Sequence, residues 1–279
     1  MKILLLGSKG QVGRELARSL APLGHVTALD RTQLDITDGD KIAAAVRAAS
    51  PNVIVNAAAY TAVDRAESER DLAFSVNAAA PGVLAAQAAK LGALFVHYST
   101  DYVFDGTKAG PYREDDPPHP LNIYGASKLA GERAIAATGC RHLILRTSWV
   151  YGPHGSNFMR TILRAARERP ELRVVDDQVG APTTSLAIAR ATAEVLRHPA
   201  EGLYHMSAAG QTSWCGFARA ILSRAGIRTP VVAIRSEEYP TAARRPRNSL
   251  LDNSRLREAF GVSLAPWEEG LAEVPFALT

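Results

Sequence analysis

A short apolar stretch followed at once by three evenly spaced glycines begins the chain. Lys2 to Leu6 has the length and composition of a buried parallel strand, Gly7, Gly10 and Gly13 follow it, and Arg14 to Leu20 has the pattern of an amphipathic helix. In that order the first glycine permits a tight turn, the second lets a pyrophosphate approach the backbone, and the third lets the helix pack on the strand. The stretch predicts the phosphate-binding turn of a dinucleotide fold, with an ordinary strand-to-helix turn as the alternative.

The next strand ends in residues that bear on the choice of cofactor. His25 to Leu29 is a predicted strand, and Asp30 follows it at about 20 residues past the glycines, where a carboxylate binds the ribose hydroxyls of adenosine. The neighbouring Arg31 is suited to the 2′-phosphate of NADPH instead. Because the two residues point to different cofactors, the sequence predicts NADPH or NADH without choosing between them. Asp35 and Ile36 are candidate contacts on the adenine side, or else the start of the next helix.

Apolar strands alternate with helical stretches through the first half of the chain. Pro51 to Asn56 and Leu94 to Tyr98 are predicted strands, and a helix that ends near Leu91 separates them. This alternation predicts an α/β fold built on a doubly wound parallel sheet of the Rossmann type. Small residues after the third strand leave room for a ligand against the backbone, although close packing of a helix explains them too. The candidate cofactor contacts in the glycine turn and in the loop after Asn56, besides the glycines themselves, are Gln11, Val12, Ala57, Ala58, Ala59 and Tyr60.

A tyrosine and a lysine four residues apart form a candidate catalytic pair. In a helix, Tyr124 and Lys128 lie on one face, one turn apart. An ammonium beside a phenol favours the phenolate and lowers the tyrosine pKa from about 10, which suits a general acid or base. Ser99 and Thr100 end the fourth strand at the same edge as the glycine turn, where a hydroxyl can donate to a carbonyl oxygen that gains charge. A solvated helix face and a strand-end cap are the alternatives.

Composition and charge limit the classes of partner. The 279 residues carry a net charge of +4, but the basic residues are scattered and do not alternate with aromatics, which argues against nucleic acid. The two cysteines form no disulfide framework and no metal-ligand spacing, and this fits a reducing cytoplasm. The apolar start is too short for a signal peptide, and no apolar run reaches the ~20 residues of a membrane span. We therefore expect a cytoplasmic protein that binds neither nucleic acid nor a membrane.

Several sequence strings, taken together, resemble one family nearly from end to end. The strings are Gly7-x-x-Gly10-Gln11-x-Gly13, Asn56 to Asp64, Ser99 to Gly106, Tyr124-x-x-x-Lys128, Arg146 to Gly152, Asp177-Gln178-x-Gly180-x-Pro182-Thr183 and Arg245-Pro246-x-Asn248-Ser249. Through them the chain resembles the extended short-chain dehydrogenase/reductase superfamily and, inside it, the dTDP-4-dehydrorhamnose reductases. The glycine and Tyr/Lys strings are specific only to the superfamily, whereas Ser99 to Gly106 and Arg146 to Gly152 are far more specific.

The resemblance implies an activity and a catalytic triad. With Thr100, Tyr124 and Lys128 as catalytic residues, the enzyme would reduce the C4 keto group of dTDP-4-dehydro-L-rhamnose with NADPH or NADH, which gives dTDP-L-rhamnose in the last step of its biosynthesis. Ser99, Tyr124 and Lys128 would also contact the cofactor, with Lys128 at the nicotinamide ribose. Sister enzymes that dehydrate nucleotide sugars follow the matching threonine with Asp-Glu. Here Tyr102 follows Asp101 instead, and without that glutamate as proton acceptor, carbonyl reduction is favoured over dehydration. The alternatives are a reductase of another 4-keto-deoxysugar nucleotide and a non-catalytic, cofactor-binding regulatory subunit, which would be free to lose the catalytic pair.

The second half of the chain, from about Gly152, is richer in Pro and Arg and is expected to form a smaller α/β substrate-binding lobe. The candidate contacts with the nucleotide sugar, on the strength of the resemblance, are Thr61, Val63, Thr100, Tyr102, Trp149, Asn157, Arg245, Asn248 and Ser249. Three of them have local alternatives. Trp149 suits a buried indole, Asn157 a helix N-cap, and Arg245 a solvated basic loop.

The same resemblance bears on domains and assembly. We expect residues 1–150 to form the dinucleotide-binding domain, joined by about 177–206, with 151–176 and 207–279 as the substrate-binding lobe. Some relatives form dimers bridged by a metal bound to glutamates, and Glu15 lies where one ligand would come from. No partner for it is evident near Ser185-Leu186 or at the C-terminus. We therefore predict no metal and a monomer or weak homodimer.

Overall fold

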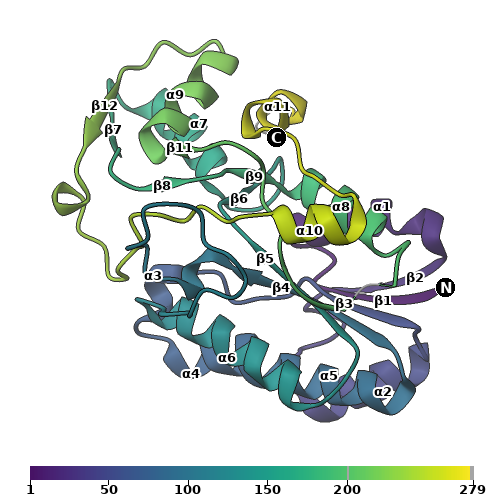
Figure 1. Cartoon of the computed structure of the whole chain (residues 1–279). Helices are drawn as coiled ribbons and strands as arrows, with labels where there is room; N and C mark the ends of the chain where they lie inside the picture. Colours follow the sequence, from purple (N-terminus) through teal and green to yellow (C-terminus); the bar gives the residue numbers. More distant parts are fainter. Residues whose placement is uncertain (200, 277–279) are drawn as a thin grey trace.

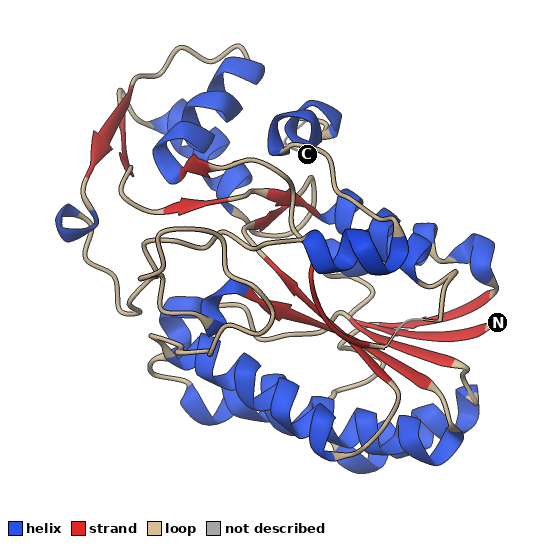
Figure 2. Ribbon diagram, in the orientation of Figure 1, coloured by secondary structure: helices blue, strands red, loops and turns tan. Residues whose placement is uncertain are grey.

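A six-stranded sheet forms the larger part of the molecule in the computed structural model, which describes residues 1–199 and 201–276 (Figures 1 and 2). Its strands are β1 (Lys2–Leu6), β2 (His25–Leu29), β3 (Val53–Asn56), β4 (Leu94–Thr100), β5 (His142–Thr147) and β10 (Gly202–His205). They lie in the order β10-β5-β4-β3-β1-β2, and every neighbouring pair is parallel. The order reverses at β1, which lies between β2 and β3, so the carboxyl ends of β1 and β3 form the switch point where such sheets bind ligands.

Helices cover both faces of this sheet, as the doubly wound prediction requires (Figure 1). One face is covered by α2 (Gly39–Ala49), α4 (Arg70–Phe74), α5 (Ala80–Leu91) and α6 (Ile123–Ala137), and the other by α1 (Gln11–Ser19), α8 (Ser185–Val195) and α10 (Ser254–Phe260). Successive side chains of β1 point to opposite faces of the sheet, so this one strand contributes to the apolar clusters on both faces. Leu4 and Leu6 pack into one apolar cluster with residues of α2 and α5, whereas Ile3 and Leu5 pack into the other with residues of α1 and α8.

Within the described residues, the smaller lobe consists of three two-stranded sheets and three α-helices, in the upper part of Figure 1. Its strand pairs are β6 (Val150–Tyr151) with β9 (Thr183–Thr184), β7 (Leu172–Val175) with β12 (Val231–Ile234), and β8 (Val179–Gly180) with β11 (Thr212–Ser213). Its helices are α7 (Phe158–Glu168), α9 (Trp214–Arg224) and α11 (Trp267–Glu273). They share an apolar cluster of their own that includes Met159, Phe217 and Trp267.

The chain passes between the two parts more than once. Strand β10 extends the large sheet beside β5, and α8 packs against α1, so residues far along the chain complete the dinucleotide-binding part. Strand β8 pairs instead with β11 in the smaller lobe, while Leu256 and Phe260 of α10 belong to a core cluster of the large sheet. The domain boundaries given above stay a prediction.

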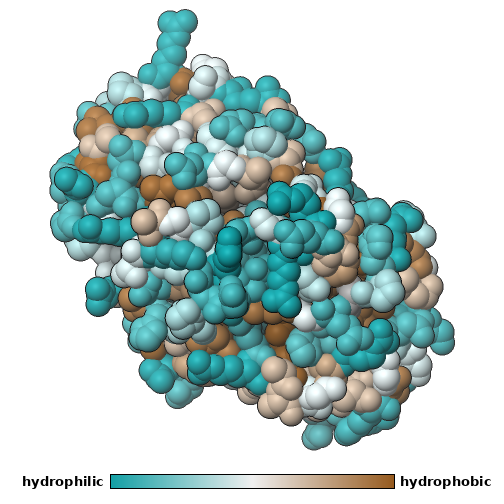
Figure 3. Space-filling model, viewed as in Figure 1, coloured by the Kyte–Doolittle hydropathy of each residue, from teal (hydrophilic) through white to brown (hydrophobic). Residues whose placement is uncertain are grey.

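One continuous helical run, Arg70–Leu91, is long and apolar enough to cross a membrane by length and composition alone. It comprises α4, a π-helical turn (Ser75–Ala79) and α5. In the fold, Leu84, Ala85 and Ala88 of this run are fully buried in the cluster beneath the sheet. A core helix passes the same test of length and composition, so the run is explained by its packing here. On the face seen in Figure 3, apolar residues form small separate groups among hydrophilic ones.

Candidate active site

A cavity of about 470 Å³ lies at the carboxyl ends of β1, β2 and β3, at the switch point of the sheet. The candidate cofactor contacts that line it are Gly7, Gly10, Asp30, Arg31, Asp35, Ile36, Ala57, Ala58, Ala59 and Tyr60. Lys9, which the sequence did not single out, lines it as well. The structure thus brings the glycine turn, the end of β2 and the alanine loop to one place.

The glycines of the turn are required by close backbone approaches. A Cβ on Gly7, whose φ is +76°, would lie 2.6 Å from the Ala58 nitrogen, and a Cβ on Gly13 would lie 2.1 Å from the Gly7 carbonyl oxygen. The N-cap residue Gly10 offers no side-chain hydrogen bond to the first turn of α1, so these N–H groups can bind phosphate oxygens. Val12 and Gly13 line neither this cavity nor the second cavity described below, since Val12 packs on the core and Gly13 packs on the turn. Their assignment to the cofactor stays a prediction.

The acid at the end of β2 is already paired. Asp30 is buried, and one carboxylate oxygen lies 2.5 Å from the Lys9 ammonium while the other accepts from the backbone and hydroxyl of Thr32. These bonds, that of Lys9 above all, hold the pKa of Asp30 well below its usual range. Two cations, Lys9 and the exposed Arg31, therefore line the cavity near the end of β2 together with one neutralised acid. That charge pattern accommodates a 2′-phosphate as well as free ribose hydroxyls.

A second cavity, of about 260 Å³, lies beyond the end of β4, between the two parts of the molecule. The candidate catalytic and substrate residues that line it are Thr61, Val63, Ser99, Thr100, Tyr102, Tyr124, Trp149 and Asn157. Gln11, a predicted cofactor contact, lines it as well, and the lining residues without a predicted role are Asp101, Thr147, Val150, Ser156 and Trp214. Residues from six separate parts of the chain therefore form a single chamber around Thr100 and Tyr124.

Thr100 is held by its neighbours in the chain. Its hydroxyl donates to Asp101 Oδ1 at 2.9 Å and accepts from the Tyr102 backbone N–H at 3.1 Å. Asp101 is only 2% exposed, and no residue within the described chain donates to its Oδ2. Burial raises the pKa of Asp101 to about 6, although hydrogen bonds from the Ser249 and Thr100 hydroxyls oppose the shift. The site thus contains a carboxyl group that takes up a proton only slightly below neutral pH.

Tyr124 lies in the first turn of α6, which Asn122 caps by accepting from the Gly125 N–H. Its ring meets that of Tyr102 edge to face, with centroids 5.6 Å apart. Burial raises the pKa of Tyr124 to about 12, with Asp101 acting in the same direction and the Thr100 hydroxyl opposing it. This is opposite to the lowered pKa that the sequence predicted, because desolvation outweighs any stabilisation of the phenolate. The phenol therefore keeps its proton at neutral pH.

Lys128 is placed one turn further along the same face of α6. It is 2% exposed, donates to the Tyr98 carbonyl oxygen at 2.6 Å, and has its Nζ 3.0 Å from His97 Nε2. Burial lowers the pKa of Lys128 to about 8, while the charge of Glu132 opposes the shift. Lys128 lines neither cavity, because its ammonium turns toward β4. His97 was not predicted, since it occurs in an apolar strand segment without a motif of its own.

Ser99 points to a different partner from Thr100, because successive side chains of a strand alternate. Its hydroxyl donates to Glu132, which also accepts two hydrogen bonds from the Arg146 guanidinium at 2.9 and 2.7 Å. Glu132 and Arg146 are both buried, so this ion pair is a structural link between α6 and β5. Ser99 lines the chamber next to Thr100, and its contact with the cofactor stays a prediction.

Two tryptophans form the wall of the chamber opposite β4. The rings of Trp149 and Trp214 are nearly parallel, with centroids 3.5 Å apart. Trp149 has φ of +46°, a left-handed conformation that is uncommon for a large residue and that is often found at functional sites. Gly180 makes room for it, since a Cβ there would lie 2.4 Å from Trp149 Cε2. Trp149 is thus both a buried indole and a part of the chamber wall.

Asn157 and Gln11 connect the two parts of the molecule beside the chamber. Asn157 Oδ1 accepts from the Arg160 N–H, which makes Asn157 the N-cap of α7. Its Nδ2 donates to Gln11 Oε1 at 2.8 Å and to the Gly152 carbonyl oxygen at 2.9 Å. The side-chain amide of Asn157 is therefore hydrogen-bonded within the protein. This agrees with its role as a helix N-cap, which was the alternative to sugar binding. Gln11 belongs to the glycine turn, so the phosphate-binding turn and the smaller lobe are directly linked.

Three candidate substrate residues lie outside the chamber. Arg245 donates to both carboxylate oxygens of Asp64, and Asn248 donates to the carbonyl oxygens of Lys108 and Gly110. Ser249 is buried behind Asp101. Arg245 is therefore neither a solvated basic residue nor, in this arrangement, an unpaired guanidinium ready for a diphosphate. A role for these residues in substrate binding stays a prediction.

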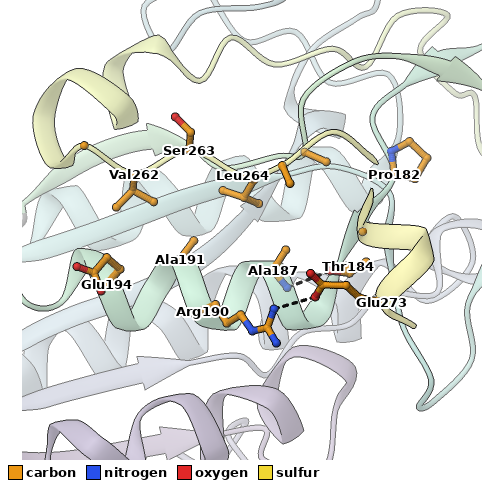
Figure 4. Close-up of a pocket in the computed structure, with 14 residues that line it drawn as sticks. Pro182, Thr184, Ala187, Arg190, Ala191, Glu194, Val262, Ser263, Leu264 and Glu273 are labelled. Carbon is orange, nitrogen blue, oxygen red and sulfur yellow. Dashed lines mark hydrogen bonds and ion pairs between the residues drawn. The ribbon is translucent and has the colours of Figure 1, made fainter. Parts of the chain in front are cut away.

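Two further hollows in the described part of the chain are lined by none of the predicted cofactor or substrate residues. The one in Figure 4, of about 440 Å³, lies between α8 and the segment from Gly261 to Ala265, and an ion pair between Arg190 and Glu273 lies along it. Another is lined by both Glu15 and Glu273. Within residues 1–199 and 201–276, no three His, Cys, Asp or Glu side chains are grouped to hold a metal ion. The absence of a metal stays a prediction.

A glycine turn at the switch point of a parallel sheet, with a tyrosine and a lysine one turn apart beside it, defines an oxidoreductase of the extended short-chain dehydrogenase/reductase class. The family model described as RmlD substrate binding domain matches residues 1–278. The chain belongs to this family, that of the dTDP-4-dehydrorhamnose reductases.

Individual relatives agree over almost the whole length. The dTDP-4-dehydrorhamnose reductase of Burkholderia thailandensis is 52% identical over 96% of this chain and 95% of its own. The enzyme of the same name from Escherichia coli K12 is 44% identical, over 97% and 96%. A crystal structure of the Bacillus anthracis dTDP-4-dehydrorhamnose reductase in complex with NADP has a TM-score of 0.95 and 38% identity, and covers 98% of this chain and 99% of that one. The predicted family and fold class are confirmed.

Proposed function

We propose that this protein reduces the C4 keto group of dTDP-4-dehydro-L-rhamnose with NADPH or NADH and so completes the synthesis of dTDP-L-rhamnose. The observation that carries the proposal is the chamber in which Thr100 and Tyr124 stand together between the cofactor turn and the tryptophan wall. The chamber contains a phenol that can donate a proton, that of Tyr124, and a hydroxyl at the end of β4, that of Thr100. Carbonyl reduction needs both groups. The family relationship supplies the sugar nucleotide.

The dinucleotide fits the first cavity. The glycine turn and the uncapped first turn of α1 would hold its pyrophosphate, and the end of β2 with Arg31 would hold the adenosine. The nicotinamide, when bound, would supply the hydride. The protein's own task is then to place the keto group and to deliver one proton. Lys128, with two of its three N–H groups used on β4, would offer the third to the nicotinamide ribose.

Tyr124 is the proposed proton donor. Its high pKa keeps the phenol protonated until an alkoxide, which is a much stronger base, forms beside it. Thr100 would turn its hydroxyl hydrogen from Asp101 Oδ1 to the same oxygen as charge develops. Tyr102 occupies the position at which a dehydratase would need a carboxylate base, and its ring packs on Tyr124 instead. The chamber therefore favours one proton transfer to oxygen and no abstraction from carbon.

Replacement of the phenol tests these roles. Tyr124→Phe removes the donor without changing the ring, and we expect kcat to fall by about 10²–10⁴-fold. The matched control is Tyr239→Phe, at an exposed tyrosine away from both cavities, with kcat unchanged. NADPH binding, followed by fluorescence, shows that the Tyr124 variant remains folded and loaded. Reduction at the wild-type rate by that variant would refute the assignment.

The choice of sugar, the cellular compartment and the assembly remain open to test. Reduction of a different 4-keto-deoxysugar nucleotide is a second candidate activity, since Thr100 and Tyr124 would act on the keto group whichever sugar carries it. Comparison of kcat/KM for a panel of 4-keto-deoxysugar nucleotides distinguishes the two. We further propose a cytoplasmic monomer or weak homodimer without a metal. Sedimentation and activity in the presence of a chelator test this.

A further inference from the structure

The side chain of Lys128 contacts His97, a histidine of β4 that has no role in the proposed mechanism. Lys128 Nζ lies 3.0 Å from His97 Nε2. His97 is fully buried in β4, with its ring stacked against Phe95 of the same strand at a centroid distance of 6.1 Å. Burial and the charge of Lys128 keep the pKa of His97 well below its usual range. The imidazole is therefore neutral, with one nitrogen that donates and one that accepts.

The other imidazole nitrogen faces an asparagine on the neighbouring strand. Asn56 of β3 is paired in register with His97, and its Nδ2 lies 3.2 Å from His97 Nδ1. Asn56 is 1% exposed, and its Oδ1 accepts the backbone N–H of Ala58 at 3.2 Å. Ala58 lies against Gly7 in the wall of the cofactor cavity. A continuous row of polar contacts therefore runs from Lys128 to that wall.

The charge of Lys128 decides which groups in this row of polar contacts must donate a hydrogen bond and which must accept one. An ammonium has only donors, so it requires His97 Nε2 as an acceptor, and the hydrogen of the ring must then be on Nδ1. A neutral amine can accept from Nε2–H, and Nδ1 is then free to accept from Asn56 Nδ2, as the orientation of that amide has it. In the first case Asn56 must turn its oxygen toward His97 and give up the bond from Ala58. The ammonium thus requires the Nδ1–H tautomer, whereas the neutral amine permits the Nε2–H tautomer, which is the one that suits the orientation of Asn56.

We propose that His97 is a positioning residue of the reductase, which couples the proton of Lys128 to Asn56 by exchanging its tautomer. Lys128 can then lose its proton to water without leaving a buried donor opposite another donor. Asn56, whose amide is oriented by Ala58, favours the neutral amine. The inference concerns how charge is controlled in the proposed active site, and its test does not depend on the activity of that site.

The other polar and charged groups on the elements around Lys128 interact chiefly with other residues. Glu132, on the same helix, is the carboxylate whose charge acts on Lys128, and it is paired with Arg146 of β5. Asp101, in the turn that follows β4, acts on Tyr124. The π-helical turn that packs on α6 presents the uncharged Asn77, which is bonded to the Ser127 hydroxyl. Besides the Tyr98 carbonyl oxygen of β4, which carries no titratable proton, His97 and Asn56 are thus the side chains through which strands β3 and β4 can act on the lysine.

The experiment follows both partners by NMR in the wild-type protein. Carbon-13 at Cε of the six lysines reports the protonation of Lys128, and nitrogen-15 in the imidazole rings reports the tautomer of His97. Lys128→Arg and His97→Phe assign the two signals. We expect His97 to carry its hydrogen on Nδ1 below the pKa of Lys128 and on Nε2 above it. A tautomer that does not change while Lys128 titrates would overturn the proposal.

An isosteric variant adds a second readout. Asn56→Asp keeps an acceptor for Ala58 and presents another acceptor to His97 Nδ1–H, which fixes the tautomer that the ammonium needs. We expect the pKa of Lys128 to rise by about one unit, or about tenfold in proton affinity. The same substitution in a His97→Phe protein should raise it by less than half as much. Equal shifts in both backgrounds would mean that the new charge acts through space, and the coupling would be refuted. Asn52→Asp, which adds a carboxylate before β3 at the far end of the strand, is the control.

Discussion

Replacement of Asp101 by asparagine should stabilise the protein, and by an amount that grows with pH. Burial raises the pKa of this carboxyl from 3.8 to about 6. A shift of about two units corresponds to roughly 3 kcal/mol, at ~1.4 kcal/mol per unit. Above about pH 6 the group is ionised in both the folded and the unfolded protein, so the folded protein carries the whole penalty. Asp101→Asn removes that penalty and keeps an oxygen that can accept from Thr100.

The sign of the pH dependence follows from the order of protonation. As the pH falls from about 6 toward about 4, the folded protein binds the proton first and the penalty is relieved. Below that range both states are protonated, and the two proteins differ little on this account. We therefore expect Asp101→Asn to raise the free energy of unfolding by up to about 3 kcal/mol near pH 7.5 and by almost nothing near pH 4.

Urea unfolding of both proteins at several pH values measures the difference directly. The control is Asp105→Asn, because the backbone N–H of Thr107 and the Tyr112 hydroxyl hold the pKa of Asp105 below its usual value. That variant should be less stable than the wild type at neutral pH, and its deficit should shrink as the pH falls. An advantage of Asp101→Asn that is the same near pH 4.5 and near pH 7.5 would refute the reasoning.

Three further substitutions test other features. Arg31→Ala should raise KM for NADPH by about 10–100-fold and leave KM for NADH nearly unchanged, since a charge-assisted hydrogen bond contributes ~1.5–3 kcal/mol; equal effects on both cofactors would contradict this. Gly180→Ala forces a Cβ into Trp149, and we expect a lower melting temperature and a raised substrate KM; normal values of both would argue against the contact. Glu132→Gln leaves the Arg146 charge buried and should lower the free energy of unfolding by about 3–5 kcal/mol in urea; a loss below ~1 kcal/mol would contradict it.

The parts of the fold that the sequence predicted are those encoded by local pattern. The apolar strand, the glycines and the helix after them are adjacent in the chain, so the turn at Gly7 could be predicted together with its place at the edge of the sheet. The spacing of Tyr124 and Lys128 was enough to place both on one face of α6. Strand ends that carry Thr100 and Ala57 meet at one edge because parallel strands all point the same way.

What could not be predicted depends on pairing between distant residues. The contact between Asn56 and His97 requires the register of β3 against β4, which neither strand specifies alone. The direction of the Lys128 ammonium follows from its contacts with His97 and with the Tyr98 carbonyl oxygen of β4, and the raised pKa of Tyr124 follows chiefly from burial. Arg245 looked like an anion-binding residue in its own loop, but its partner Asp64 is 181 positions away in the chain. Electrostatic roles of this kind become visible only when the two segments are brought together.

The late position of β10 and α8 in the chain has a consequence for synthesis on the ribosome. The first five strands of the sheet emerge in order, but the edge of β5 is not covered until Gly202 to His205 has left the exit tunnel. The face of the sheet beneath α1 waits still longer, because Leu256 and Phe260 complete its apolar cluster. The nascent protein therefore holds an open parallel edge and an uncovered apolar face through most of its translation. A chaperone that binds such surfaces would meet this chain during elongation, well before the catalytic chamber exists.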